Sequence, residues 1–244
     1  MRTRVSPTMR ALAAKVGKVG LLKKLLSPIY TAYKRNIQSR RNRLFRENGV
    51  NVLKEYDAIL SSIDVQYSVF AGTLLGAVRE KGFLKHDVDI DTVIFNCDYT
   101  PKIKQALEQN GFKLVHYYLI DNGDKGREET YEKNGVSIDI FYIYSDEKYP
   151  TYQCDFHALD GSTSHEDSMT KYGYVATRRI EFPVSHKVTR IQFEDISVNA
   201  ISNANEWLEY RYGKNYMIPD PDFRDKGDNP HIFEWTEVKA IMKY

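Results

Sequence analysis

The sequence predicts an α+β fold in which a mixed β-sheet is flanked by helices and preceded by a basic helical N-terminal arm. Apolar residues recur at helical spacing through the first 63 residues. After them, short runs rich in β-branched and aromatic residues alternate with helical patterns and glycine turns. The 244 residues, 42% of them hydrophobic, can bury a full core. We therefore expect an arm over residues 1–46 and one domain over residues 47–244.

Charge is distributed unevenly along the chain. Every charged residue in 1–46 is Lys or Arg, whereas the remainder is net acidic. A basic arm suits an anionic membrane surface or nucleic acid, and an acidic body argues against a nucleic-acid groove. We expect no nucleic-acid partner. Because the chain has only two cysteines and no apolar run of the ~20 residues that a membrane span needs, we expect a cytoplasmic protein, peripheral to the inner face of the membrane.

The arm is expected to be helical. Residues 9–26 form a basic amphipathic pattern that ends at Ser27 and Pro28, and residues 30–46 continue basic and helical. One interpretation is a helix lying on an anionic membrane, where each basic residue adds about 1 kcal/mol. The other is a helix packed against its own domain or a partner protein.

The segment that follows the arm is expected to build the centre of the fold. Residues 51–63 have the apolar period of a helix packed on a sheet. Residues 66–71 form a short strand that leads into a glycine turn, and residues 74–79 form a helix with Thr73 as its N-cap. Residues 85–95 form a strand that carries three carboxylates.

The remaining elements are predicted from the same rules. Glycine and proline mark the helix ends, and aromatic and β-branched runs mark the strands. Expected helices are residues 101–110 and 205–212; expected strands are residues 112–120, 136–144 and parts of 190–201. Residues 152–186 are polar, rich in tyrosine and unassigned.

Asp87, Asp89 and Asp91 alternate along their expected strand, so their side chains should share one face. Three neighbouring anions repel one another unless a positive charge lies between them. A hard divalent cation, Mg2+ or Mn2+, accepts oxygen ligands from carboxylates and phosphates alike. The pattern therefore predicts a site for metal and phosphate.

Asp139 is the single charged residue of the expected strand 136–144. A carboxylate in an apolar strand is costly to bury unless it is paired or binds metal. If the two strands are neighbours, Asp89, Asp91 and Asp139 converge as the ligands of two ions about 3.5–4 Å apart, which is a geometry used for phosphoryl transfer.

The glycine turn before the carboxylates is a candidate phosphate site. Gly72 and Gly76 allow backbone N–H groups to approach a phosphate at a helix N-terminus. Arg79 can hold phosphate oxygens with its bidentate guanidinium.

These residues carry a resemblance to a known family. Residues 71–95, AGTLLGAVREKGFLKHDVDIDTVIF, resemble the signature of the LicD/fukutin-type phosphotransferases, within the nucleotidyltransferase superfamily. The later isolated Asp139 and the Tyr212-Gly213 pair follow the motif order of that family. Lys85 and His86 depart from it, because Pro-Trp or Pro-His often precedes the acidic run there.

The resemblance implies a nucleotidyltransferase-like catalytic domain and a reaction. Family members transfer a substituted phosphate such as phosphocholine, glycerol phosphate or ribitol phosphate from a CDP-linked donor to a sugar hydroxyl. The acceptor is a cell-surface glycan or a lipid-linked glycan, and CMP leaves. The alternatives are a nucleotidyltransferase that moves NMP from an NTP with release of pyrophosphate, and a non-catalytic nucleotide-binding or membrane-associated module.

The resemblance also implies roles for single residues. By matching positions, the metal ligands are Asp89, Asp91 and Asp139, and the residues that hold the donor phosphates include Gly72, Thr73 and Arg79. Either Asp91 or Asp139 accepts the proton of the attacking hydroxyl.

Overall fold

A mixed β-sheet of 11 strands organises the computed structural model, which describes residues 20–145, 151–220 and 232–244. The strands are β1 (Ser68–Val69), β2 (Asp89–Phe95), β3 (Lys113–Ile120), β4 (Gly126–Lys133), β5 (Val136–Tyr144), β6 (Tyr152–His157), β7 (Ala176–Glu181), β8 (Val188–Phe193), β9 (Ile196–Ile201), β10 (Ile232–Glu234) and β11 (Ala240–Lys243). The helices are α2 (Gly20–Ser62), α3 (Ala71–Arg79), α4 (Lys102–Gln109), α5 (His165–Tyr172) and α6 (Ala204–Tyr212), with short 3-10 turns η1 (Asn96–Asp98) and η2 (Asp121–Gly123).

The strand order is β10-β7-β6-β5-β2-β1-β9-β8, and β4, β3 and β11 branch from β5. The pairs β2–β5 and β1–β9 are parallel, and the other named pairs are antiparallel. This arrangement confirms the predicted α+β fold with a mixed sheet and flanking helices. Because β5 pairs with β2, β4 and β6, it lies at the centre of the network.

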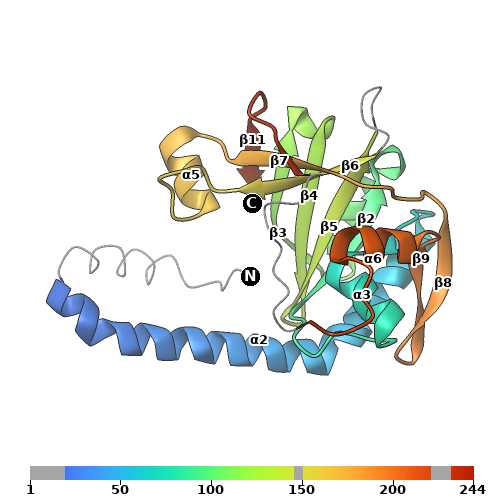
Figure 1. Ribbon diagram of the computed structural model, residues 1–244, viewed down its shortest axis with the longest axis horizontal. Coiled ribbons are helices and arrows are strands. Elements are labelled where there is room, and N and C mark those ends of the chain that lie inside the picture. The colour runs from blue at the N-terminus through green and yellow to red at the C-terminus, as the bar shows by residue number, and fades with distance from the viewer. Residues whose placement is uncertain (1–19, 146–150, 221–231) are drawn as a thin grey trace.

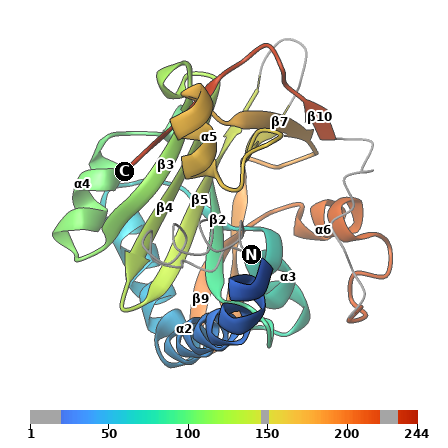
Figure 2. The same cartoon turned by 90° about the vertical axis from the view of Figure 1, so that its left-hand side faces the viewer.

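The two faces of β2 have different roles. Ile90, Thr92 and Ile94 alternate on one face and are fully buried, and the Thr92 hydroxyl lies 3.1 Å from the hydroxyl of Tyr56 in α2. The intervening positions, which include Asp91, lie on the other face, next to α3. Figure 1 shows α2 running beneath the sheet and extending past it, and Figure 2 places α4 and α3 on opposite sides of the central strands.

α2 differs from the prediction. The expected stop at Ser27 and Pro28 is wrong, because one helix of 43 residues runs through both and includes the helix predicted for 51–63. An interior proline costs about 3 kcal/mol of helix propensity, and the helix-forming leucines and lysines before it and the packing of the C-terminal half offset that cost. The part of the predicted helix over residues 9–19 lies outside the described residues. α2 also crosses residues 46 and 47 without a break, so the division into arm and domain stays a prediction.

Several strands were missed or misplaced. β4 had no assignment, although Asn134 and Gly135, with φ of 52° and 77°, form the two-residue turn that joins it to β5. The unassigned segment contains β6, α5 and β7. The strand predicted for 66–71 is reduced to two residues, and the one predicted for 85–95 begins only at Asp89.

No helix in the described ranges is long and apolar enough to cross a membrane. The cytoplasmic location stays a prediction.

Candidate active site

Strand register brings the predicted carboxylates together. Asp91 and Asp139 are directly paired on the parallel strands β2 and β5, and Asp89 pairs with Ser137 two residues before them. All three aspartates are half-buried, on the same face of the sheet. The neighbouring strands on which the predicted convergence depends are therefore present.

The charges at this face repel one another. Burial raises the pKa of Asp91 well above its ordinary value, and the charges of Asp89, Asp139 and Asp87 raise it further. A hydrogen bond from Gly72 N–H acts in the opposite direction. A hard divalent cation prefers carboxylate oxygens and would offset their mutual repulsion, so the chemistry of these donors fits Mg2+ or Mn2+. Among the described residues, the ligand atoms of Asp89, Asp91 and Asp139 are not all within 4.8 Å of one another, so a bound ion would have to draw these side chains together.

Asp139 is held in place by the missed strand β4. The Thr130 hydroxyl donates to Asp139 Oδ1 at 2.6 Å, and His116 Nε2 lies 3.2 Å from the same hydroxyl. Thr130 lies directly opposite Asp139 in the ladder. The Asn-Gly turn was the signal that predicts this strand and, with it, the partner of Asp139.

The first turn of α3 is bonded to Asp91 at three points. Phe70 N–H donates to the Asp91 carbonyl at 2.9 Å, Gly72 N–H donates to Asp91 Oδ2 at 3.2 Å, and Asp91 N–H donates to Thr73 Oγ1 at 2.9 Å. Ala71, between them, has φ of 43°, a left-handed value that costs a non-glycine residue 1–3 kcal/mol, as a rough figure. The positive end of α3 is thereby directed at the carboxylates.

The first turn of α3 differs from the prediction in the residue that caps the helix. The N-cap of α3 is Phe70, and Thr73 lies within the helix, where its hydroxyl accepts the backbone N–H of Asp91. A β-carbon on Gly72 would lie 3.5 Å from Asp91 Oδ2 and 3.7 Å from Asp87 Oδ1. Gly72 therefore faces the carboxylate cluster.

Comparison with known proteins identifies the family of this chain. The family described as LicD/FKTN/FKRP, nucleotidyltransferase domain, matches residues 64–203, which is more than half of the chain and includes all three aspartates. The chain belongs to this family.

The individual relatives in the LicD/FKTN/FKRP family share low sequence identity with this chain. The chain is 27% identical to the ribitol-5-phosphate transferase FKTN of Mus musculus and 26% identical to that of Homo sapiens, over 204 residues in each case. Those alignments cover 80% of this chain and 40% of the relative, so the chain spans about two fifths of their length. The lipopolysaccharide cholinephosphotransferase LicD of Haemophilus influenzae is 38% identical over 50 residues, 20% of this chain and 19% of that protein.

Asp87 lies outside the strand that was predicted to carry it. It precedes β2, and its Oδ2 accepts the N–H of Leu84 at 2.7 Å. Burial raises its pKa to about 6. Asp87 thus orders the loop before β2 and adds negative charge near Asp91.

The other two predicted phosphate-site residues are engaged within the protein. A β-carbon on Gly76 would lie 2.4 Å from the Gly82 carbonyl oxygen, so this glycine permits close packing of α3 on the following loop. Arg79 Nη1 donates to the Tyr216 carbonyl at 3.2 Å, and its charge lowers the pKa of Asp87. Arg79 therefore lies close to the acidic cluster. Binding of donor phosphates by Gly72, Thr73, Gly76 and Arg79 stays a prediction.

Arg41 is a residue that the sequence interpretation missed at this site. It is half-buried on α2, one turn before Phe45, whose ring packs on Phe83 with centroids 4.6 Å apart. Burial raises the pKa of Asp89, and the charge of Arg41 lowers it. The cluster of Arg40, Arg41, Arg43 and Arg46 near the end of the arm was the available signal, but no contact between these arginines and the carboxylates was predicted.

A second group of potential metal ligands lies elsewhere. One ligand atom from each of Cys97, Asp98 and His186 comes within 4.8 Å of the other two. His186 Nε2 is 2.7 Å from Asp98 Oδ2, and this group follows the C-terminal end of β2, whereas Asp89 and Asp91 lie at its beginning. Asp98 and His186 are 88 positions apart in sequence, so their spacing gave no indication that they form a group.

Proposed function

We propose that this chain transfers a substituted phosphate from a CDP-linked donor to a sugar hydroxyl of a glycan, with release of CMP. The observation that carries the proposal is the in-register pair Asp91 and Asp139 beside the N-terminus of α3. Relatives in the family are named as transferases of ribitol 5-phosphate and of phosphocholine. Glycerol phosphate is a third group of the same class.

Asp89, Asp91 and Asp139 would hold one or two Mg2+ or Mn2+ ions. A bound cation supplies positive charge to the phosphate oxygens and to the attacking and leaving oxygens of an in-line displacement. The donor set of half-buried carboxylates supports this assignment.

The protein's own groups would bind and orient the reactants. Gly72 and the positive end of α3 would hold the donor phosphates, with Thr73 and Arg79 nearby. The sugar oxygen forms a bond to the phosphorus of the transferred group, the bond from that phosphorus to the CMP oxygen breaks, and the hydroxyl proton passes to Asp91 or Asp139.

The test replaces a metal ligand and identifies the product. Asp139→Asn should lower CMP release from CDP-linked donors by at least about 100-fold, the loss expected from one electrostatic contact in a transition state. A chelator should have the same effect on the unchanged protein. Asp124→Asn, a change at an exposed aspartate outside the site, should leave the rate unchanged. The donor panel is CDP-choline, CDP-glycerol and CDP-ribitol, each with a glycan acceptor.

Each alternative function has its own outcome in this assay. Pyrophosphate released from an NTP, with no CMP from any CDP-linked donor, would identify a nucleotidyltransferase. A protein that binds CDP with Mn2+ but releases neither product would be a non-catalytic module. Turnover retained by the Asp139→Asn variant would reject the mechanism.

A further inference from the structure

A cavity of about 220 Å³ adjoins the candidate active site. Its walls include Ala71, the residue before Gly72, and Phe141, two positions after Asp139 on β5. Residues two apart on a strand lie on the same face, about 7 Å from each other. The cavity therefore opens beside the carboxylates, on the same face of the sheet.

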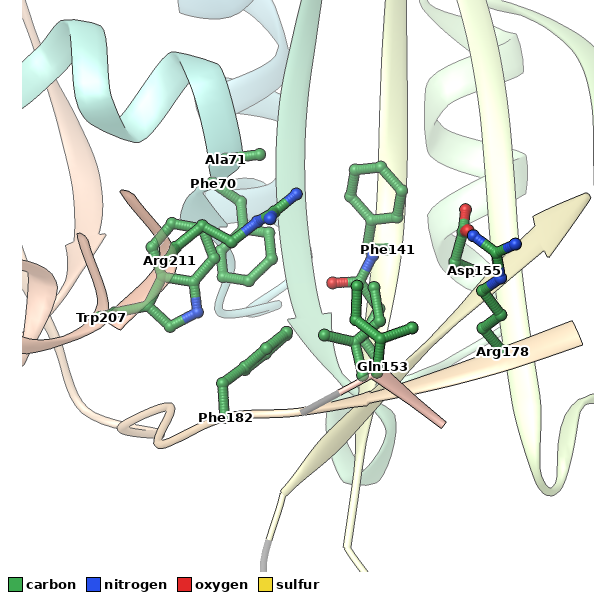
Figure 3. Close-up of a pocket in the computed structure, with 11 residues that line it drawn as sticks. Phe70, Ala71, Phe141, Gln153, Asp155, Arg178, Phe182, Trp207 and Arg211 are labelled. Carbon is green, nitrogen blue, oxygen red and sulfur yellow. The ribbon is translucent and has the colours of Figure 1, made fainter. Parts of the chain in front are cut away.

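One wall of the cavity carries a buried donor without a partner. The Trp207 side chain of α6 is 1% exposed, and its Nε1–H has no hydrogen-bond partner among the described residues. Figure 3 shows the indole nitrogen on the side of the ring that faces the cavity. The ring is fixed by Phe70 and Phe182, at centroid distances of 4.4 and 5.7 Å. Since leaving a buried donor unsatisfied is costly, this position favours a ligand with an acceptor.

The opposite wall offers a ring surface and polar groups. Phe141 is half-buried, and Figure 3 shows it across the cavity from Trp207. Gln153 and Asp155 share one face of β6, with the guanidinium of Arg178 drawn beside Asp155. The amide of Gln153 both donates and accepts, whereas an ionised Asp155 only accepts.

A guanidinium lies between this cavity and the phosphate-binding end of α3. The Arg211 side chain extends from α6 toward Ala71 and Phe141. Two arginines, 178 and 211, and one carboxylate line the cavity, and Arg178 Nε also donates to Glu234 Oε1 at 2.6 Å. The guanidinium of Arg211 suits a phosphate better than a cationic group such as choline. A planar ring with a mixed polar edge and an attached phosphate matches all of these walls.

We propose that the cavity binds the nucleoside base of the donor, with the base over Phe141, its carbonyl accepting from Trp207 Nε1–H, and its diphosphate between Arg211 and the start of α3. An exocyclic amino group would donate to Gln153 or Asp155. Gln153 can also donate to the carbonyl oxygen of uracil, whereas Asp155 can only accept. Contact of the exocyclic group with Asp155 is therefore what would make the cavity select cytosine over uracil. This assignment rests on the proposed function for the CDP-linked donor and adds the residues that recognise its base.

The two tryptophans of the chain, 207 and 235, allow a binding test that is independent of turnover. Trp235→Phe leaves Trp207 as the only indole and is the matched control, because Trp235 packs on Tyr152 at 6.1 Å and is not among the lining residues. With Mn2+ present, CDP should quench the emission of the Trp235→Phe protein. It should not change the emission of the Trp207→Phe protein.

Affinities then separate base from phosphate recognition. We expect unchanged protein to bind CDP about tenfold more tightly than UDP, and Trp207→Phe to weaken CDP about tenfold, the effect of one buried hydrogen bond of 1–1.5 kcal/mol. That variant should bind inorganic diphosphate normally. Arg211→Met should weaken CDP and inorganic diphosphate alike. Thermal unfolding of each variant checks that its fold is intact.

The outcomes distinguish this inference from the proposed function. Normal CDP affinity and quenching in the folded Trp207→Phe protein would overturn the base subsite while leaving the CDP-linked donor in place. A raised KM for the acceptor alone would assign the cavity to the acceptor sugar instead. Selective weakening of a different nucleotide by Trp207→Phe would support the subsite and reject the CDP-linked donor. Absence of any nucleotide binding to unchanged protein would reject both.

Discussion

Asp91 is bonded through its backbone and its side chain to the first turn of α3. Its N–H, its carbonyl and its carboxylate each form a hydrogen bond with Thr73, Phe70 or Gly72. The same carboxylate lies in register with Asp139. Asp91 is therefore in a precise position that is electrostatically unfavourable unless a cation is bound, as expected for a residue selected for function.

Asp91→Asn should stabilise the protein in the absence of divalent cations. The amide oxygen can still accept from Gly72 N–H, and one of the two paired charges is removed. A like-charge pair across strands costs up to about 1 kcal/mol, or roughly 2–4 °C in Tm for a chain of this size. Thermal unfolding in a chelator measures the change.

Mn2+ provides the control for the Asp91→Asn prediction. It should raise the Tm of the unchanged protein, because a ligand that binds only the folded state stabilises it. The variant should respond much less. A lower Tm of the variant in chelator would show that the carboxylate of Asp91 stabilises the metal-free protein, and it would contradict a net repulsion between Asp91 and Asp139.

At the scale of the element, α3 shows that two positions of one motif can require glycine for different physical reasons. Gly72 faces the carboxylates with room for a methyl group, whereas Gly76 meets the backbone of Gly82. From sequence, both were predicted to serve phosphate. Sequence cannot show which side of a helix will be approached by a loop that follows it.

Gly76→Ala should lower the free energy of unfolding by about 1–3 kcal/mol, the usual cost of overpacking. Its β-carbon would lie 2.4 Å from a backbone oxygen, so the loop must move. Gly72→Ala should leave stability nearly unchanged but reduce CMP release, since its methyl group enters the carboxylate cluster. Urea unfolding and product assays on both variants test this contrast. Equal losses of stability would contradict it.

The elements that were predicted correctly are those with strong local signals. β5, and β2 from Asp89 onward, have aromatic and β-branched runs, and their carboxylates stand out in an apolar context. The sequence could not show that β2 and β5 are neighbours, because strand order depends on contacts between residues far apart in sequence. The predicted convergence of their carboxylates was therefore conditional on that pairing. Thr130, Trp207 and Arg211 reach the site or its cavity from β4 and α6, so no spacing within the central motif indicated them.

At the scale of the whole molecule, α2 connects the arm to the core. Its C-terminal half packs on the sheet through Val52, Leu53, Tyr56 and Leu60, all fully buried. Toward its N-terminus the helix extends past the sheet, and residues 35, 36, 39 and 40 are exposed. A single helix can therefore present basic residues outside the domain while Arg41 lies near Asp89.

This continuity leads to a prediction about membranes. We propose that the basic arm binds anionic lipid at the cytoplasmic face, where a lipid-linked glycan would be available. Deleting residues 1–34 should strongly reduce flotation with vesicles that contain anionic lipid, because each basic residue near such a surface contributes about 1 kcal/mol. Added salt should weaken binding of the full chain in the same assay, through screening.

The deletion should leave the candidate site intact, since Arg41, Leu44 and Phe45, through which α2 lies near the site and the core, all follow residue 34. We therefore expect unchanged CDP affinity and nearly unchanged Tm for the shortened protein, with only vesicle binding lost. Neutral vesicles are the control, and neither protein should float with them. Equal flotation of both proteins with anionic vesicles would reject the membrane role. A loss of CDP affinity without a fall in Tm would instead show that the arm acts on the site directly, in which case Arg41→Gln in the full chain should reproduce that loss.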